Sequence, residues 1–202
     1  MTKKIGVVVS GRGSNLQAIL DQIDAGTLPV EVAVVVSDHG DALALERAAK
    51  HHIPTVVVER GACADKVEFE TKIAEALESH GAELVVLAGF MRILTGGFIS
   101  RFPHRIMNIH PALLPSFTGL HAQGQAVAYG VKVSGCTVHF VDEGTDTGPI
   151  ILQKVVPVLD DDTEDSLAAR ILEEAHKALP EAIRWWAEGR LTVTGRKVFV
   201  RP

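Results

Sequence analysis

The first half of the chain repeats one pattern: short apolar runs rich in β-branched residues alternate with segments whose apolar positions recur at helical spacing. The apolar runs predict strands over residues 5–9, 30–36, 55–58 and 84–88. Helices are predicted between them, over residues 15–25, about 41–50 and about 65–80. Strands that are apolar at nearly every position are buried on both faces. This is typical of the parallel sheet in a doubly wound α/β fold.

The second half has a different pattern. Residues 135–141 and 149–158 are strand-like and are joined by a short acidic loop. Because so short a link cannot hold a crossover helix, these two strands are predicted to be antiparallel. A long helix is predicted over about 163–188, with Thr163 as its N-cap and Pro180 kinking or dividing it. Residues 191–200 predict a terminal hairpin that turns at Thr194-Gly195.

Composition narrows the class of protein. A chain of 202 residues is expected to form one domain with a substantial core. The net charge of −5 and the scattered basic residues argue against a nucleic-acid surface. No apolar run approaches the ~18 residues of a membrane span, and no signal peptide is evident, so we expect a cytoplasmic protein. The two cysteines, Cys63 and Cys136, lack the spacing of metal ligands, which suggests reduced thiols.

The first predicted strand runs into Ser10-Gly11-Arg12-Gly13-Ser14-Asn15-Leu16, which opens a helix. Glycines let the backbone approach a ligand, and the free N–H groups of a first helical turn can bind an anion. Leu16 replaces the third glycine of a dinucleotide fingerprint, and no P-loop Lys follows. The segment therefore favours a single phosphate held by Gly13, Ser14 and Asn15, although an ordinary strand–helix connection remains an alternative.

A second set of polar residues carries groups able to polarise a carbonyl and move a proton. Asn108 and His110 lie in Met107-Asn108-Ile109-His110-Pro111, and Asp146 lies in Gly144-Thr145-Asp146-Thr147-Gly148-Pro149. We expect all three in loops that follow apolar runs, where functional residues tend to be placed. Taken singly, each is explained at least as well as a turn residue beside Pro or Gly.

Two further features of the sequence bear on ligand binding: the segment after the fourth predicted strand and the number of histidines. The segment Ala88-Gly89-Phe90-Met91-Arg92-Ile93-Leu94 follows the fourth predicted strand, at the sheet edge where open α/β folds place ligands. It could border a flat heterocycle, but taken alone it is better explained by ordinary packing at the end of a strand. The chain has nine histidines, yet no HExxH motif and no clustered ligand set, so no metal is predicted.

Four ordered motifs resemble the phosphoribosylglycinamide formyltransferase family, the folate-dependent GAR transformylases of purine synthesis. They are Ser10-Gly11-Arg12-Gly13-Ser14-Asn15-Leu16-Gln17, Leu87-Ala88-Gly89-Phe90-Met91-Arg92-Ile93-Leu94, Asn108-Ile109-His110-Pro111-Ala112-Leu113-Leu114-Pro115, and Val138-His139-Phe140 with Asp146-Thr147-Gly148-Pro149. The resemblance covers nearly the whole chain. Methionyl-tRNA formyltransferase and formyltetrahydrofolate deformylase share the Asn-x-His and Asp core but carry an additional domain, for which we expect no room here.

The resemblance implies a formyltransferase fold, mostly parallel with an antiparallel carboxyl-terminal portion. It implies one domain over residues 1–202, with a phosphate-binding half of about 1–100 and a catalytic and folate-binding half of about 101–202. The implied substrates are 5-phosphoribosylglycinamide and 10-formyltetrahydrofolate, without a metal, nucleic acid or membrane, and the implied state is a monomer or homodimer. Gly13, Ser14 and Asn15 would hold the ribose 5-phosphate. Lys66 would reach the glutamate tail of the folate. The other residues expected to border the folate are Met91, Arg92, Ile93, Leu94, Asn108, Val141, Asp142, Glu143, Gly144, Thr145 and Asp146.

The resemblance also implies a catalytic set of Asn108, His110 and Asp146. The substrate amine would attack the formyl carbon, and Asn108 with protonated His110 would stabilise the oxyanion. Asp146 would favour the charged imidazole, and a proton would pass to the folate nitrogen through His110 or a water molecule. We expect no covalent enzyme intermediate.

Two departures from the family pattern weaken the expected ribose contacts. Gln123 and Gly124 stand where the family often has His and a charged residue, and Ala175 stands where an acidic residue is usual. Hydrolysis of 10-formyltetrahydrofolate is the main alternative function. A sugar-nucleotide formyltransferase and a non-catalytic folate-binding protein are less favoured, because the first needs a second domain and the second does not need the full catalytic set.

Overall fold

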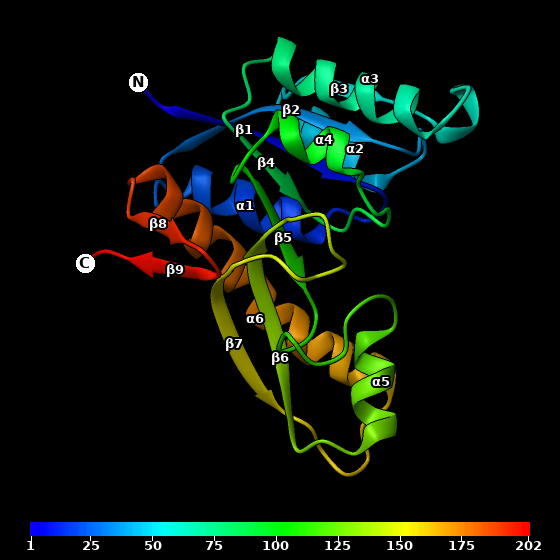
Figure 1. Ribbon diagram of the computed structural model, residues 1–202, viewed down its shortest axis with the longest axis vertical. Helices are drawn as coiled ribbons and strands as arrows, with labels where there is room; N and C mark the ends of the chain where they lie inside the picture. Colours follow the sequence, from blue (N-terminus) through cyan, green and yellow to red (C-terminus); the bar gives the residue numbers. More distant parts are fainter. The chain divides into compact units, whose positions relative to one another are not determined.

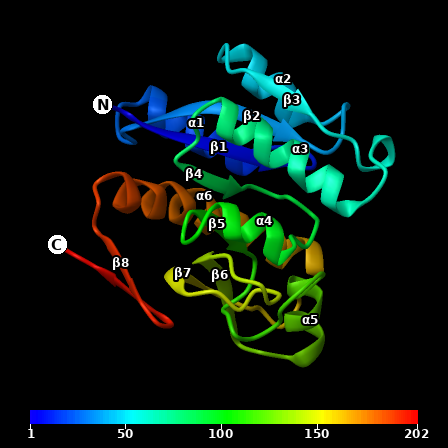
Figure 2. The same ribbon diagram turned by 45° about the horizontal axis from the view of Figure 1, so that its top comes forward.

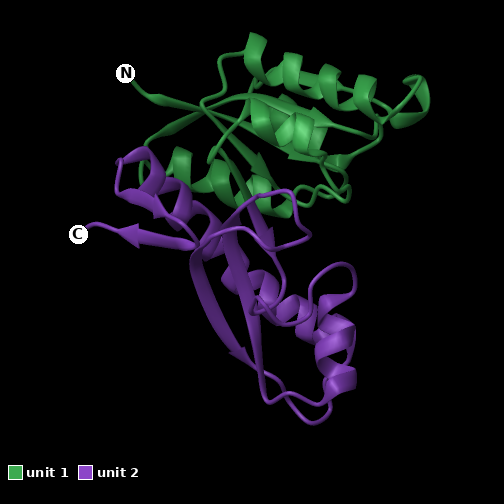
Figure 3. Cartoon of the chain, in the orientation of Figure 1, with its two compact units in different colours: residues 1–107 green, residues 108–202 purple.

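The computed structural model describes all 202 residues, which divide into two compact units, residues 1–107 and 108–202 (Figure 3). Unit 1 contains the strands β1 (Lys3–Val9), β2 (Val30–Ser37), β3 (Thr55–Val57) and β4 (Leu84–Leu87). Its helices are α1 (Ser14–Asp24), α2 (Leu43–Lys50), the short 3₁₀ helix η1 (Arg60–Ala62), α3 (Lys66–Ser79) and α4 (Gly96–Arg101). The alternation of strands and helices that the apolar pattern predicts is confirmed in this unit.

The four strands of unit 1 are parallel and lie in the order β3-β2-β1-β4. The chain steps in one direction from β1 to β3 and then crosses back to β4. Right-handed connections therefore place α1 and α2 on one face of the sheet and α3 on the other. Figure 1 shows α1 and α3 on opposite sides of these strands. The reversal creates a topological switch point at the carboxyl ends of β1 and β4, where open α/β sheets bind ligands.

Unit 2 is built around an antiparallel pair, β6 (Val133–Phe140) and β7 (Ile150–Pro157). The terminal hairpin of β8 (Leu191–Thr194) and β9 (Lys197–Val200) joins β7 through the parallel pair Ile150 and Lys197. The helix α6 (Glu164–Ala187) packs against β6, β7 and the short helix α5 (Ala122–Tyr129). Both the antiparallel pair and the terminal hairpin confirm the predictions from sequence. The mixed strand directions and covering helices make the fold α/β.

The long helix α6 begins and ends as its sequence indicates. The Thr163 side chain accepts a hydrogen bond from the Ser166 amide, and the Ser166 side chain accepts one from the Thr163 amide. The sequence predicted a kink or a division at Pro180, and the division is wrong because the helix continues through this residue. Pro180 lies in a continuous buried stripe with Leu179 and Ile183. We attribute the unbroken course of the helix to that packing.

A second expectation also fails. Asn108 and His110 were expected in a loop, but both belong to the strand β5 (Ile106–His110), which spans the boundary between the units. Polar residues inside a strand obscure its apolar pattern. Residues two apart in a strand point to the same face, so β5 directs Asn108 and His110 to one side. The strand thus directs the Asn108 amide and the His110 imidazole to the same side, and it holds them more rigidly than a loop would.

The structure contains no helix long and apolar enough to cross a membrane.

Gly135→Ala is expected to lower the free energy of unfolding by about 3 kcal/mol, because overpacking against backbone cannot be relieved by a side-chain rotation. An added Cβ would lie 1.9 Å from the Lys154 carbonyl oxygen on the neighbouring strand. Gly97→Ala is the control, since its Cβ would meet nothing closer than Thr95 Oγ1 at 3.7 Å. Denaturant unfolding measures both, and equal stabilities of the two variants would contradict the packing argument.

Candidate active site

The loop after β1 has the backbone geometry of an anion-binding site. Gly13 occupies the N-cap position of α1 with φ 70°, in the left-handed region that favours glycine. Ser14 and Asn15 form the first turn of α1, and the Gly13 carbonyl accepts from the Gln17 amide. Asn15 Oδ1 is buried without a hydrogen-bond partner. The backbone amides of this first turn are donors that suit a phosphate.

Helix α2 fixes this loop from behind. The Ala44 amide donates to the Gly11 carbonyl at 3.1 Å, and Arg47 Nε donates to the Arg12 carbonyl at 2.8 Å. A Cβ on Gly13 would lie 2.6 Å from Ala44 Cβ, so no side chain fits there. The glycine at position 13 is therefore required both by its backbone conformation and by the closeness of α2.

The second loop at the switch point covers residues 88–95, between β4 and α4. Its start is hydrogen-bonded to the loop after β1: the Ser10 amide donates to the Gly89 carbonyl, and the Met91 amide donates to Ser10 Oγ, each at 3.1 Å. Met91 and Ile93 are 66% and 63% exposed, whereas Leu94 is buried. This loop therefore presents two large apolar side chains to solvent, an unusual arrangement that suits a flat apolar ligand.

Lys66 begins α3, immediately after the N-cap residue Asp65. Its Nζ lies 3.9 Å from Glu70 Oε1, and its side chain is 47% exposed. The side chain is therefore about half exposed, and rotation of its flexible stem can bring the ammonium group from Glu70 to an anionic ligand.

In unit 2, His110 is held between two acceptors. Its side chain is 5% exposed, its Nδ1 lies 3.4 Å from Asp146 Oδ2, and its Nε2 lies 2.8 Å from the Phe117 carbonyl oxygen. An imidazole donates from both nitrogens only when it is protonated. Both ring nitrogens of His110 thus face an oxygen acceptor.

Asp146 connects the loop between β6 and β7 to the segment that follows β5. Its Oδ2 accepts a hydrogen bond from the Gly119 amide at 2.8 Å, in addition to facing His110. Asp146 itself has φ 55°, a conformation that side-chain-bearing residues rarely adopt. Positive φ values also occur at Phe117, Gly119 and His121 in the facing segment. Such backbone strain persists where the surroundings enforce it, and it concentrates at functional sites.

His139 orients the amide of Asn108. Burial lowers the pKa of His139 below its ordinary value, so the ring is neutral at pH 7. Its Nδ1 lies 2.9 Å from the Phe140 carbonyl and must carry the single proton. Nε2 is then an acceptor, and it lies 3.2 Å from Asn108 Nδ2. This arrangement directs one N–H of Asn108 to His139 and leaves the other for a ligand.

The loop 141–146 is drawn in yellow in Figure 2, between β6 and β7. Asp142 Oδ1 accepts from the Gly144 amide at 3.1 Å and from Thr147 Oγ1 at 2.5 Å. Glu143, Gly144 and Thr145 are exposed at its tip. The loop is therefore closed on itself by one carboxylate, while its middle residues stay accessible.

The positions that depart from the family pattern lie on α5 and α6. A Cβ on Gly124 would lie 2.8 Å from Glu164 Oε2, so the missing side chain leaves room for that carboxylate. Glu164 Oε1 in turn lies 3.1 Å from His121 Nδ1. Ala175 is 4% exposed and belongs to the buried face of α6. In this chain the two departures thus serve helix packing.

The structure brings Asn108, His110 and Asp146 together in unit 2, with the loop 141–146 attached to Asp146. In unit 1 it brings the loop after β1 to the loop containing Met91, Arg92, Ile93 and Leu94. Sequence reasoning assigned no role to His139, the Gly119 amide or the Phe117 carbonyl. A signal was available for His139, because it lies in one of the four quoted motifs. The two backbone groups are present whatever the side chain, so no residue type in the sequence signals them.

No three His, Cys, Asp or Glu side chains are grouped to hold a metal ion.

Comparison with known proteins places the chain in a family. The family described as "Formyl transferase" matches residues 3–183, so the chain belongs to it. A phosphoribosylglycinamide formyltransferase of Haemophilus influenzae is 42% identical over 198 residues, which cover 98% of this chain and 93% of that protein. The trifunctional purine biosynthetic protein adenosine-3 of Drosophila melanogaster is 42% identical over 95% of this chain, but the chain spans only 14% of that protein's length.

Two solved structures extend the comparison. Glycinamide ribonucleotide transformylase 1 from Symbiobacterium toebii has a TM-score of 0.97 and 51% identity, with 100% of this chain and 95% of that chain covered. A formyltetrahydrofolate deformylase from Pseudomonas syringae has a TM-score of 0.93 and 30% identity, with 100% of this chain and 67% of that chain covered. The match confirms the formyltransferase fold inferred from sequence.

The buried neutral His139 predicts a loss of stability in acid. The unfolded chain binds a proton near pH 6.5, but the folded protein does so only at lower pH. The free energy of unfolding therefore falls as the pH drops below 6.5, by up to about 1.4 kcal/mol per pH unit. His139→Gln, which keeps an acceptor but does not titrate, should show a correspondingly shallower fall between pH 6.5 and the lower pKa.

Denaturant unfolding at several pH values measures these slopes. His104→Gln, at an exposed histidine, is the control and should keep the slope of the unaltered protein. The same slope in His139→Gln as in the control would contradict the neutral assignment.

Proposed function

We propose that this protein transfers the formyl group of 10-formyltetrahydrofolate to the amine of 5-phosphoribosylglycinamide in de novo purine synthesis. The observation that carries the proposal is the grouping of Asn108, His110 and Asp146, with His110 between a carboxylate and a carbonyl oxygen. Membership of the formyl transferase family supports it, as do relatives named for this reaction that match over most of their own length.

The substrates would use different groups in the two units. The ribose 5-phosphate would bind to Gly13, Ser14 and Asn15, where the free amides of the first turn of α1 can donate to the phosphate oxygens. The folate ring would contact the loops 91–94 and 141–146 together with Asn108, and Lys66 would attract the anionic glutamate tail. These loops offer apolar side chains and backbone groups, which suit a flat heterocycle with a polar edge.

The chemistry requires stabilisation of one developing charge. As the substrate nitrogen bonds to the formyl carbon, the formyl oxygen becomes an oxyanion. The free N–H of Asn108 and the Nε2–H of protonated His110 would donate to it, with the oxyanion replacing the Phe117 carbonyl as the His110 acceptor. Asp146 would stabilise the imidazolium through Nδ1. The bond from carbon to the folate nitrogen then breaks, and the amine proton moves to that nitrogen through His110 or water.

His139 would act before the chemistry, by setting the Asn108 amide. Were the amide reversed, its oxygen would face the bare Nε2 of neutral His139 and repel it, while both N–H groups pointed elsewhere. The buried ring thus makes one orientation of the amide favourable. The oxyanion donor is thereby oriented before the substrate binds.

Hydrolysis of 10-formyltetrahydrofolate is the second candidate, because the deformylase named above shares the fold over the whole of this chain. In that reaction water would replace the amine. The transferase is favoured because relatives named as transferases are more similar to this chain, at 42% and 51% identity against 30%.

The experiment that separates these functions follows the consumption of 10-formyltetrahydrofolate by absorbance, with and without 5-phosphoribosylglycinamide. The proposal predicts turnover only when the ribonucleotide is present. Equal turnover without it would indicate a hydrolase, and no turnover despite folate binding would indicate a binding protein.

His110→Ala and Asp146→Asn are each expected to lower kcat by on the order of 10²–10⁴-fold, because each removes part of the oxyanion and proton-transfer system. Steady-state kinetics measures the loss, and circular dichroism checks that the fold is retained. Asp161→Asn makes the same charge change at an exposed position and should leave kcat unaltered. Near-normal turnover in either active-site variant would rule out this mechanism.

Gly13→Ala is expected to raise the KM for the ribonucleotide by at least about tenfold, because both its positive φ and the contact with Ala44 force the loop to move. The KM for the folate is the internal reference and should change much less. Gly61→Ala, where an added Cβ meets nothing within 4 Å, is the matched control. An unchanged ribonucleotide KM in Gly13→Ala would refute the phosphate assignment.

A further inference from the structure

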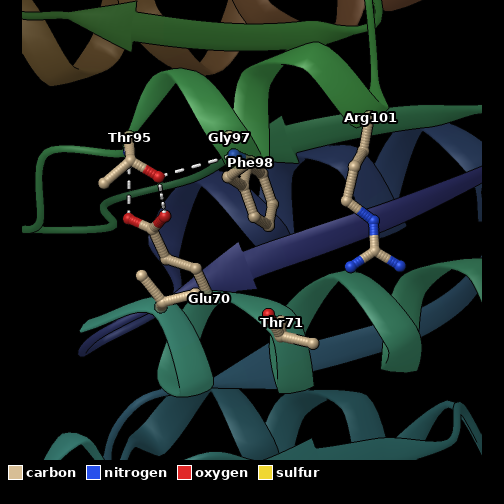
Figure 4. Close-up of a pocket in the computed structure, with 7 residues that line it drawn as sticks. Glu70, Thr71, Thr95, Gly97, Phe98 and Arg101 are labelled. Atoms are coloured by element: carbon tan, nitrogen blue, oxygen red, sulfur yellow. Dashed lines mark hydrogen bonds between the residues drawn. The ribbon is translucent and has the colours of Figure 1, made fainter. Parts of the chain in front are cut away.

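The loop 88–95 is held in unit 1 by two buried carboxylates as well as by Ser10. At its end, Glu70 on α3 accepts hydrogen bonds from the Thr95 amide, at 3.0 Å, and from the Thr95 hydroxyl. Figure 4 shows both bonds, with Thr95 also capping α4 through the Phe98 amide. In its middle, Arg92 Nε donates to Asp38 Oδ2 at 2.5 Å. The loop is thus fixed at its start, middle and end.

The Asp38–Arg92 pair is unusual in its burial. The Asp38 side chain is 1% exposed, and the Arg92 side chain is 36% exposed. Asp38 follows the last residue of β2, so it is attached to the sheet, and its amide faces the Val9 carbonyl of β1. The Arg92 guanidinium carbon also lies 5.3 Å from the centre of the buried Phe69 ring. Arg92 is therefore directed toward the sheet and α3 by two separate contacts.

Turning the Arg92 side chain away from Asp38 would be electrostatically unfavourable. A buried carboxylate that loses its cation carries an uncompensated charge, which is costly in a protein interior. Asp38 Oδ1 has no hydrogen-bond partner. The other nearby cation candidate, His39, lies 3.6 Å from Oδ2 with its side chain 53% exposed. Arg92 is consequently the main cation that compensates the negative charge of Asp38, and its side chain is held in that contact.

Because the Arg92 side chain is held by Asp38, the side chains on either side of it in the sequence point elsewhere. Met91 and Ile93 flank it in the sequence and are both largely exposed, whereas Arg92 is directed toward Asp38. The sequence had suggested that the loop around Arg92 could border a flat heterocycle. The structure adds that the Arg92 side chain is an anchor, so the loop offers its backbone and the two apolar side chains to a ligand.

We propose that Asp38 is a positioning residue for the folate co-substrate, acting through Arg92 to hold the loop 91–94 in its binding conformation. The inference rests on the proposed function. Asp38 touches no reacting atom in this account. Its effect is to order the loop before the folate arrives, so that the cost of ordering is not taken from the binding free energy.

Asp38→Ala is expected to weaken binding of 10-formyltetrahydrofolate by about tenfold or more, through loss of this preorganisation. Calorimetric titration of the protein with 10-formyltetrahydrofolate alone measures the Kd. In steady-state kinetics the folate KM should rise by a similar factor, while kcat and the ribonucleotide KM stay within about twofold. Asp41→Ala, three residues along at an exposed position, is the control. If Asp38→Ala lowers Tm so far that folding fails, Asp38→Asn replaces it.

A double variant shows whether Asp38 acts through Arg92. In the presence of Arg92→Met, replacing Asp38 should cause no further weakening, so the double variant should bind folate as weakly as Asp38→Ala. Independent, multiplying effects would overturn the inference, as would unchanged folate binding in Asp38→Ala or an equal loss for both substrates. Failure of the unaltered protein to bind folate would be a different result, because it would contradict the proposed function itself.

Discussion

The geometry of the candidate active site depends on one carboxylate. Oδ2 of Asp146 receives the Gly119 amide at 2.8 Å and faces His110 Nδ1 at 3.4 Å, so it joins three segments that are separate in the sequence. Without it, the β6–β7 loop would lose its link to the segment after β5, and His110 would lose one of its two oxygen neighbours. The positive φ of Asp146 indicates that the backbone accepts strain to place this group.

The two units contribute different kinds of chemistry. Unit 1 offers mainly backbone groups at a topological switch point, where the conformation of Gly13 and the closeness of α2 shape the loop after β1. Unit 2 offers side chains whose donor and acceptor roles are fixed by their neighbours. His110 faces two oxygen atoms, whereas His139 is neutral by burial and accepts from Asn108. His110 and His139 thus have different hydrogen-bonding roles because their surroundings differ.

The regular part of the fold was predictable because its signal is local. The strands of unit 1 are continuous apolar runs, and the ends of α6 carry capping residues, so their boundaries followed within about two residues. The elements that escaped prediction are short or mixed in polarity. Helix α4 has six residues, too few to display a helical period. Helix α5 buries only two alanines, so its sequence shows no clear apolar stripe. Strand β5 was missed because Asn108 and His110 interrupt its apolar pattern.

Much of the candidate site was also identified from sequence, but mainly through the resemblance of four motifs. What could not be predicted is the part that depends on distant backbone. The Phe117 carbonyl and the Gly119 amide act irrespective of their side chains, and the proton on His139 is located by the Phe140 carbonyl. The anchoring of Arg92 by Asp38 depends on a contact across 54 residues of sequence. Such relations emerge only when the chain is folded.

The central claim is tested most directly by the fate of the transferred carbon. The protein would be incubated with 5-phosphoribosylglycinamide and 10-formyltetrahydrofolate labelled with ¹³C in the formyl group, and the products would be followed by ¹³C NMR. The account predicts that the label appears as a formamide on the ribonucleotide amine, with only a trace of formate. Label recovered mainly as formate would contradict it, since water rather than the amine would then be the acceptor.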